Sequence, residues 1–294
     1  MNLTYISAGG DRLPLLSHEM FDLTHIEGQT YAAASISSKT IGGTDGSFVN
    51  NTQATPRSIE LDLRIKSGVD VEDAKRTILK IVKVKQRGTL EWTQNERTVV
   101  ISGIVESVDM PRWAGGVTMQ LTLYCDQPFW EDVDFVVQHI SEAVDLHYFT
   151  DGETDMLYFP EEGIALGEYD MLRTRECYND GDVAVGLEIS IVALGTVTNP
   201  IIYDGDGNFF GLGYTTQAKS SATQFVMEAG DNVVITTHKG NKTVRLNGEM
   251  IYGHIKPQST WLQLAAGNNQ FTINSDDDSL TNMAFSLIYK QRYI

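Results

Sequence analysis

The oxygen-bearing side chains of Asp204-Gly205-Asp206-Gly207-Asn208 come closest to a pattern for metal chemistry. Carboxylate and amide oxygens at the first, third and fifth positions are typical of a calcium-binding loop. Such a loop also needs Gly at the sixth position and Glu at the twelfth, where this sequence has Phe209 and Thr215. The pattern therefore favours a β-turn, and Asp276-Asp277-Asp278 is interpreted as a solvated turn. We predict no metal site.

Patterns for catalysis or nucleotide binding are missing at the points where they would be expected. Gly211-Leu212-Gly213 lacks the third glycine of a dinucleotide fingerprint, because Thr216 holds that position. There is no phosphate-binding loop and no Gly-x-Ser-x-Gly elbow, and the six histidines form no pair at metal-ligand spacing. We therefore predict a protein that is not an enzyme and that needs no cofactor.

Four tryptophans could stack on sugars, namely Trp92, Trp113, Trp130 and Trp261. Most tryptophans in β-proteins are core or interface residues, so this chemistry is the less favoured one. Trp261 remains the candidate sugar contact.

The composition predicts a folded chain with two domains. It has 294 residues, of which 41% are hydrophobic and 21% charged. The apolar runs are too short to cross a bilayer, and the N-terminus lacks the features of a secretion signal. Cys125 and Cys177 are the only cysteines, which favours free buried thiols in a reducing cytoplasm. We expect no membrane insertion.

Charge is both strongly negative and unevenly distributed. The formal net charge of −17 opposes binding to phosphate backbones, so no direct sequence-specific nucleic-acid partner is expected. Residues 126–182 hold 16 acids and two bases. Six bases crowd into a short stretch, namely Lys75, Arg76, Lys80, Lys83, Lys85 and Arg87. These regions are either two solvated faces or complementary surfaces on neighbouring copies.

Most of the sequence has the alternating pattern of short β-strands. Ile59, Leu61, Leu63 and Ile65 alternate with charged residues, which predicts one buried and one wet face. The same alternation is found at residues 117–125, 185–193, 243–246 and 283–289. Asn247-Gly248 predicts a two-residue hairpin turn, because both central positions of a type I′ turn need positive φ.

One stretch has helical spacing, with apolar residues recurring close to every 3.6 positions at Val71, Ala74, Ile78, Ile81 and Val82. Asp70 is placed to cap its N-terminus, and the basic cluster suits the negative end of its dipole. Gly88 is interpreted as the stop signal. The pattern predicts a helix within residues 70–85.

Residues 37–56 predict a long exposed loop or hairpin tip, since Ile41, Phe48 and Val49 are their only large apolar residues. Acidic residues mixed with aromatics between positions 129 and 148 mark a domain boundary. We place the domains at residues 1–132 and 133–294, with residues 133–182 assigned to no clear pattern.

Several segments resemble the distal tail protein family of siphophage-type tails. Leu123-Tyr124-Cys125-Asp126-Gln127-Pro128-Phe129-Trp130 resembles the close of that family's N-terminal belt domain, and the preceding order of polar loop, strand, helix and strands is similar. Three later segments follow in the order of the family's galectin-like domain, namely Gly230-Asp231, Leu246-Asn247-Gly248 and Leu264-Ala265-Ala266-Gly267-Asn268-Asn269. The succession covers most of the chain.

The resemblance implies a mainly β chain with one helix, comprising an N-terminal split β-barrel belt domain and a C-terminal galectin-like β-sandwich. It also implies a structural protein that forms a hexameric ring in a phage tail tip or baseplate, assembled in the host bacterial cytoplasm. The implied partners are other copies of the chain, the tail tube protein, the tail-tip hub protein and the receptor-binding protein. Contractile tails and tail-derived bacteriocin particles share this architecture.

Within such a ring, we expect Lys75, Arg76, Lys80 and Lys83 to dock on an acidic surface of a neighbouring copy. Ile41, Phe48 and Val49 would extend toward an adjacent subunit or the tube, and an acidic lumen would let DNA pass without sticking. The alternative function is a carbohydrate-binding module or adhesin that contacts a cell-wall glycan through Trp261. A cell-wall hydrolase is disfavoured because catalytic motifs are missing.

Overall fold

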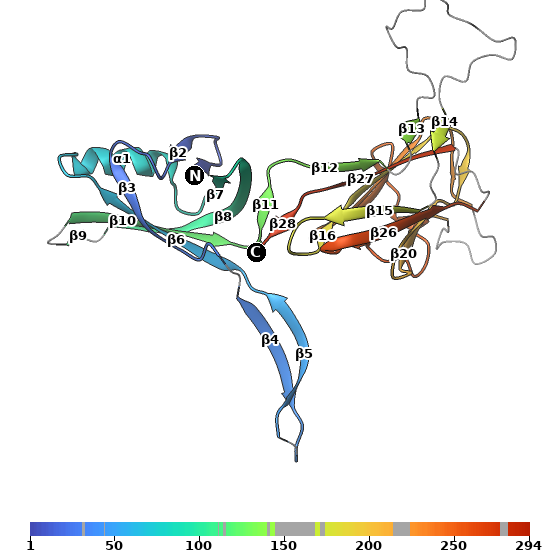
Figure 1. The fold of residues 1–294 in the computed structure, drawn as a ribbon, viewed down its shortest axis with the longest axis horizontal. Coiled ribbons are helices and arrows are strands. Elements are labelled where there is room, and N and C mark those ends of the chain that lie inside the picture. The colour runs from blue at the N-terminus through green and yellow to red at the C-terminus, as the bar shows by residue number, and fades with distance from the viewer. Residues whose placement is uncertain are drawn as a thin grey trace, which may run out of the picture. The chain divides into compact units, whose positions relative to one another are not determined.

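A computed structural model describes residues 1–30, 33–43, 45–110, 112–113, 116–139, 142–144, 168–170, 174–213, 224–276 and 282–294. The chain divides into two compact units (Figure 1): unit 1 comprises Met1–Asp134 and Arg292–Ile294, and unit 2 comprises Phe135–Gln291. Across these described residues the fold is mainly β with one α-helix, which confirms the fold class predicted from the sequence.

Unit 1 is built on a large antiparallel sheet with the strand order β2-β1-β7-β8-β10-β6-β3. The strands of this order are β1 (Asn2–Ser7), β2 (Arg12–Pro14), β3 (Phe21–Glu27), β6 (Arg57–Ile65), β7 (Arg87–Gln94), β8 (Arg97–Asp109) and β10 (Gly116–Cys125). β9 (Arg112–Trp113) pairs with β10, while β11 (Trp130–Asp132) pairs with β8 and with β28 (Arg292–Tyr293). In the described part of unit 1 the sheet does not close, so the expected split barrel is an open sheet.

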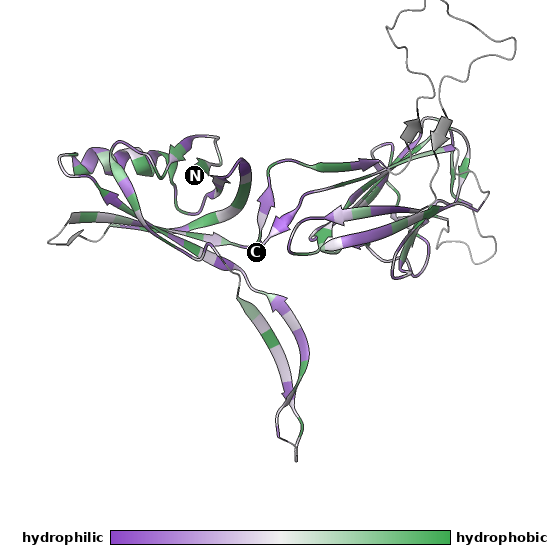
Figure 2. Cartoon of the chain, viewed as in Figure 1, coloured by the Kyte–Doolittle hydropathy of each residue, from purple (hydrophilic) through white to green (hydrophobic). Residues whose placement is uncertain are grey.

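Burial of one face holds this sheet together. β6 and β10 pair over their length, with Leu61 opposite Leu121 and Leu63 opposite Met119, and all four side chains are buried. Hydrophobic and hydrophilic residues alternate along both strands (Figure 2), as the sequence predicted. Ala74 and Ile78 of α1 (Val71–Ile81) belong to the same core, so the helix covers this face of the sheet.

The helix begins as predicted but ends earlier. The Asp70 carboxylate accepts hydrogen bonds from the backbone N–H groups of Glu72 at 2.9 Å and Asp73 at 3.0 Å. The helix ends at Ile81, because the following residue becomes extended and enters the core. The interpretation of Gly88 as the stop is wrong: it lies inside β7, where a Cβ atom would be 2.3 Å from the Tyr5 hydroxyl.

Residues 37–56 prove to be most of a β-hairpin. β4 (Ala34–Thr40) pairs with β5 (Ser47–Ala54) as a separate two-stranded sheet, and every residue in both strands is exposed. Figure 1 shows this pair pointing away from the rest of unit 1, and we call it the arm.

Unit 2 is a sandwich of a six-stranded sheet, in the order β12-β27-β17-β22-β23-β24, and a four-stranded sheet, in the order β15-β26-β19-β20. The six strands are β12 (Val136–His139), β17 (Glu188–Ala193), β22 (Asn232–His238), β23 (Asn241–Leu246), β24 (Glu249–Met250) and β27 (Met283–Tyr289). The four strands are β15 (Thr174–Asn179), β19 (Ile201–Asp204), β20 (Phe209–Gly211) and β26 (Gly267–Asn274).

Short elements complete unit 2: β13 (Glu142–Val144) with β14 (Glu168–Asp170), β16 (Val185–Gly186) with β25 (Gln263–Leu264), β18 (Val197–Thr198) with β21 (Val226–Met227), and the 3₁₀ helix η1 (Tyr252–His254). The two large sheets share one core, to which Ile189, Ile235 and Phe285 contribute from one sheet and Phe210 and Phe271 from the other. The alternating run at residues 185–193 is divided between β16 and β17.

Candidate assembly surfaces

The basic cluster lies on the outer side of α1 and just beyond it. Arg76, Lys80 and Lys83 are exposed, while Ala74 and Ile78 hold the opposite side of the helix in the core. Burying only one stripe of the helix leaves the cationic stripe in solvent. The structure therefore brings the predicted basic residues together on one surface.

Two apolar residues in this surface were missed by the sequence analysis. Leu79 and Val84 are exposed among the lysines, and neither continues the apolar spacing that marks the buried side of the helix. A surface that combines cations with exposed aliphatic side chains is suited to contact another protein. We call Lys75, Arg76, Leu79, Lys80, Lys83 and Val84 the helix surface.

The arm presents apolar side chains on both of its faces. Val49 lies opposite Ser38, two residues along β4 from Ile36, so Ile36 and Val49 share one face. Phe48 lies on the other face, opposite Lys39. The exposed fractions of Ile36 and Phe48 are both 63%. Ile36 was missed because it precedes the segment that the composition singled out, whereas Ile41, Phe48 and Val49 were predicted.

The root of the arm is anchored in unit 1. Arg57, only 6% exposed, directs Nη1 toward the backbone oxygens of Gly28 and Gln29, at 3.4 and 3.2 Å. Trp130 Nε1 donates to the Gln29 oxygen as well, at 3.0 Å. Gly28 has φ +77°, and a Cβ atom there would lie 2.1 Å from the Ser58 backbone oxygen. These contacts fix the positions where the chain enters and leaves the arm.

The sheet face that α1 does not cover is polar and rich in acids. Glu60 and Asp62 of β6 lie between the buried positions of that strand, on its wet face. Glu27 lies opposite Glu60 on β3, and Arg64 of β6 lies on the same wet face. We call Glu27, Glu60 and Asp62 the acidic face.

Two of the segments that carried the resemblance, Gly230-Asp231 and Leu246-Asn247-Gly248, meet as interlocked turns in unit 2. Asn247 and Gly248 have φ values of +50° and +89°, which confirms the type I′ turn. Asn247 Nδ2 donates to Asp231 at 2.7 Å, and Asp231 accepts from the Glu228 backbone N–H at 2.9 Å. These hydrogen bonds, the backbone one first, lower the pKa of the Asp231 carboxyl.

Trp261 is only partly exposed. Its ring packs against Phe210 of the core with centroids 5.0 Å apart, and Lys242 Nζ lies 5.8 Å from its centroid. The indole therefore contributes to packing, which restricts the face that it could offer to a sugar.

Asp204 forms the predicted β-turn. Its carboxylate accepts from the backbone N–H groups of Asp206 at 3.0 Å and Asn208 at 2.8 Å, so its oxygens are used locally. In the described residues, no group of three or more His, Cys, Asp and Glu is placed to hold a metal. Burial raises the pKa values of the Cys125 and Cys177 thiols to about 11 each.

No helix in the described segments is long and apolar enough to cross a membrane. Asp276 is described and accepts a hydrogen bond from Asn199, whereas residues 277 and 278 of the predicted acidic turn lie outside the described residues. About half of the acid-rich region 126–182 lies outside them as well.

Comparison with known proteins adds a family and a fold. Residues 180–293 match the family described as siphovirus-type tail component, C-terminal domain. No curated protein sequence matches the chain. The fold is similar to the crystal structure of SPP1 Dit (gp 19.1), which is described as a paradigm of hub adsorption apparatus in phages infecting Gram-positive bacteria. The two sequences are 14% identical, the TM-score is 0.65, and the alignment covers 99% of each chain.

Two structures of the activated phage P2 baseplate, with Ca and with Sr, are 11% and 12% identical, each with a TM-score of 0.45. The alignment with the Ca structure covers 100% of this chain and 98% of the relative. The alignment with the Sr structure covers 99% of this chain and 97% of the relative. SPP1 Dit shares the fold of this chain over both units. Residues 180–293 thus resemble the C-terminal domain of siphovirus-type tail components, and the resemblance of this chain to the distal tail protein family is confirmed.

Proposed function

We propose that this chain forms a closed ring at the distal end of a phage or phage-like tail, joining the tail tube to the tip and receptor-binding apparatus. The observation that carries the proposal is the arm, a hairpin with exposed apolar side chains on both faces. An isolated two-stranded hairpin is marginally stable in water, so such an arm gains most by packing on another chain. The protein acts by assembly rather than by catalysis.

The ring is built by heterologous contacts between unit 1 of successive copies. In a head-to-tail contact two different surfaces of one chain meet, and the ring closes when the rotation between copies closes. The helix surface supplies cations and two apolar side chains, and the net charge of −17 makes acidic partner surfaces plentiful. Six copies per ring and the split into belt and galectin-like domains follow from the resemblance to distal tail proteins.

The arm extends to an adjacent subunit or to the tail tube protein. Its fixed root at Arg57 and Gly28 sets its direction, and Ile36, Phe48 and Val49 provide the apolar contact. The tail-tip hub protein and the receptor-binding protein are the partners proposed for the opposite side of the ring.

The acidic face lines the lumen. Its position on the sheet face that α1 leaves open allows six copies to present carboxylates toward a common axis. Negative charge there repels DNA during its passage. Replacing Glu60 and Asp62 by Lys should give rings that retain DNA at low salt and release it at high salt. If the variant rings retain no more DNA than the native rings do, the acidic face does not line the lumen.

The test of the ring is the mass of the purified chain in solution by light scattering, at low and high salt. We expect a closed multiple of 32.6 kDa, and specifically six copies. The double variant Lys80→Glu and Lys83→Glu should weaken the ring most at low salt, where ionic contacts are screened least. The matched control is Lys239→Glu with Lys242→Glu, which changes the charge equally on exposed residues of unit 2.

Two outcomes would count against parts of this proposal. A native chain that stays monomeric both alone and when mixed with purified tail tubes would remove the ring. Equal loss of mass in the helix-surface variant and in the unit 2 control would indicate that only the total charge matters, and would remove the helix surface from the interface.

A further inference from the structure

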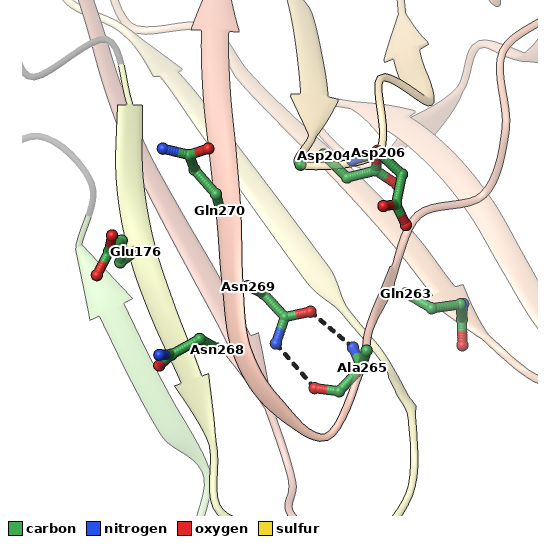
Figure 3. A pocket seen from close by; sticks show the side chains of 9 residues that line it. Glu176, Asp204, Asp206, Gln263, Ala265, Asn268, Asn269 and Gln270 are labelled. Carbon is green, nitrogen blue, oxygen red and sulfur yellow. Dashed lines mark hydrogen bonds between the residues drawn. The ribbon is translucent and has the colours of Figure 1, made fainter.

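Unit 2 carries a polar groove beside its four-stranded sheet (Figure 3). Its volume of about 360 Å³ lies within the range of roughly 300 to 1,000 Å³ that is usual for small-ligand sites. The lining side chains include three carboxylates and four amides, with no Lys, Arg or His among them. The residues come from positions 176, 204–206 and 263–270, which the sheet order brings together.

Some of these polar groups form fixed walls. Asn269 is bonded to the backbone N–H and carbonyl of Ala265, both at 2.8 Å, as the dashed lines in Figure 3 show. Gln263 Nε2 donates to the Thr237 carbonyl at 3.0 Å. The Asp204 carboxylate is held by its own turn. A ligand therefore meets a rim that is already ordered, which lowers the entropic cost of binding.

Other polar groups are left for a ligand. Glu176 lies directly opposite Gln270, and Tyr178 lies directly opposite Asn268, on the wet face of β15 and β26. Among the described residues, the side chains of Glu176, Asn268 and Gln270 form no hydrogen bond. Tyr178 is 56% exposed and lies next to the groove, opposite its lining residue Asn268.

We propose that this groove binds a neutral, hydroxyl-rich glycan. Carboxylates accept hydrogen bonds from sugar hydroxyls, and amides both donate and accept them. An aromatic ring can pack on the C–H face of a sugar, and Tyr178 offers an exposed ring next to the groove. The carboxylates repel phosphate and carboxylate groups and no cation in the lining offsets them, so anionic polymers are excluded. This inference does not depend on the ring.

The experiment is calorimetric titration of the full chain with neutral oligosaccharides of glucose, galactose, rhamnose and N-acetylglucosamine. Gln270→Ala and Glu176→Gln should each weaken binding about fivefold, the usual effect of losing one hydrogen bond. The double variant should lose more than either single change. The matched control is Gln224→Ala, an exposed glutamine of unit 2 outside the groove, which should bind as the native chain does.

Several results would overturn the proposal. The first is a native chain that binds none of these oligosaccharides, and the second is a preference for phosphorylated sugars. A third is binding that disappears with Trp261→Ala and stays unchanged with Gln270→Ala, which would move the contact to the tryptophan. A fourth is binding of calcium alone that the groove variants abolish, which would make the carboxylates a cation site.

Discussion

Two strand pairs of unit 1 have the same backbone pairing and opposite surroundings. β6 and β10 pair in regular register and bury every second side chain, whereas β4 and β5 pair in an almost equally regular register and bury none. Backbone hydrogen bonds are present in both, and each adds little net stability, because water offers the same bonds. The comparison indicates that burial of an apolar face stabilises unit 1, and that the arm awaits a surface supplied by another chain.

The sharpest way to break this comparison is to remove one large side chain from each pair. Leu61→Ala should lower the free energy of unfolding of unit 1 by about 3 kcal/mol, because it leaves a cavity in a packed core. Phe48→Ala in the arm should change it by less than about 0.5 kcal/mol. Chemical denaturation followed by tryptophan fluorescence measures both, in a Trp261→Phe background so that the signal reports unit 1. Equal losses would mean that the arm packs on its own unit.

A second contrast uses glycines. A Cβ atom at Gly88 would lie 2.3 Å from the Tyr5 hydroxyl, whereas a Cβ atom at Gly42, near the tip of the arm, would meet nothing within 4 Å. Gly88→Ala should therefore cost about 2 kcal/mol through overpacking. Gly42→Ala should leave the unfolding midpoint unchanged. If Gly88→Ala is also neutral, Tyr5 can move aside, and the pairing of β1 with β7 is looser than the structure indicates.

Gly88 also illustrates where sequence patterns lose information. A glycine soon after a helical run satisfies the pattern of a helix stop, and only the packing of Tyr5 reveals that it belongs to a strand. The alternation in β6, β10 and β27 was readable because one face of each strand is buried. The strands of the arm have no such alternation, so composition could not separate a hairpin from a loop.

The candidate sites differ in the same way. The cations of the helix surface are close in sequence, and the periodicity of one helix sufficed to place them on one side. The groove of unit 2 joins segments separated by up to about ninety positions, through pairings of β26 with both β15 and β19. No local pattern encodes such non-local pairing, and none of the groove residues was predicted as a site.

A smaller effect sharpens the comparison at two turns. Gly248 and Gly43 have φ values of +89° and +87°, and neither would bring a Cβ atom within 4 Å of another group. Each Gly→Ala change therefore strains only the backbone, at a cost of about 1 kcal/mol. Gly248→Ala, in the β23–β24 turn, should lower the unfolding midpoint of unit 2. This midpoint can be measured by Trp261 fluorescence after Trp92, Trp113 and Trp130 are replaced by Phe. At the arm tip the midpoint of unit 1 should stay constant, since the arm can fray alone.

The smallest stability effect is expected from the largest deletion. Residues 36–52 can be replaced by Asn-Gly, because Ser35 and Gln53 face each other in register and a two-residue type I′ turn can join them. The shortened chain should unfold within about 0.5 kcal/mol of the native chain, since the removed strands bury nothing in unit 1. Light scattering should nevertheless show loss of the ring, or co-sedimentation should show loss of binding to tail tubes. If the shortened chain still assembles and binds tubes, the arm has no part in assembly. If it unfolds at a lower denaturant concentration than the native chain, the arm contributes to the stability of unit 1.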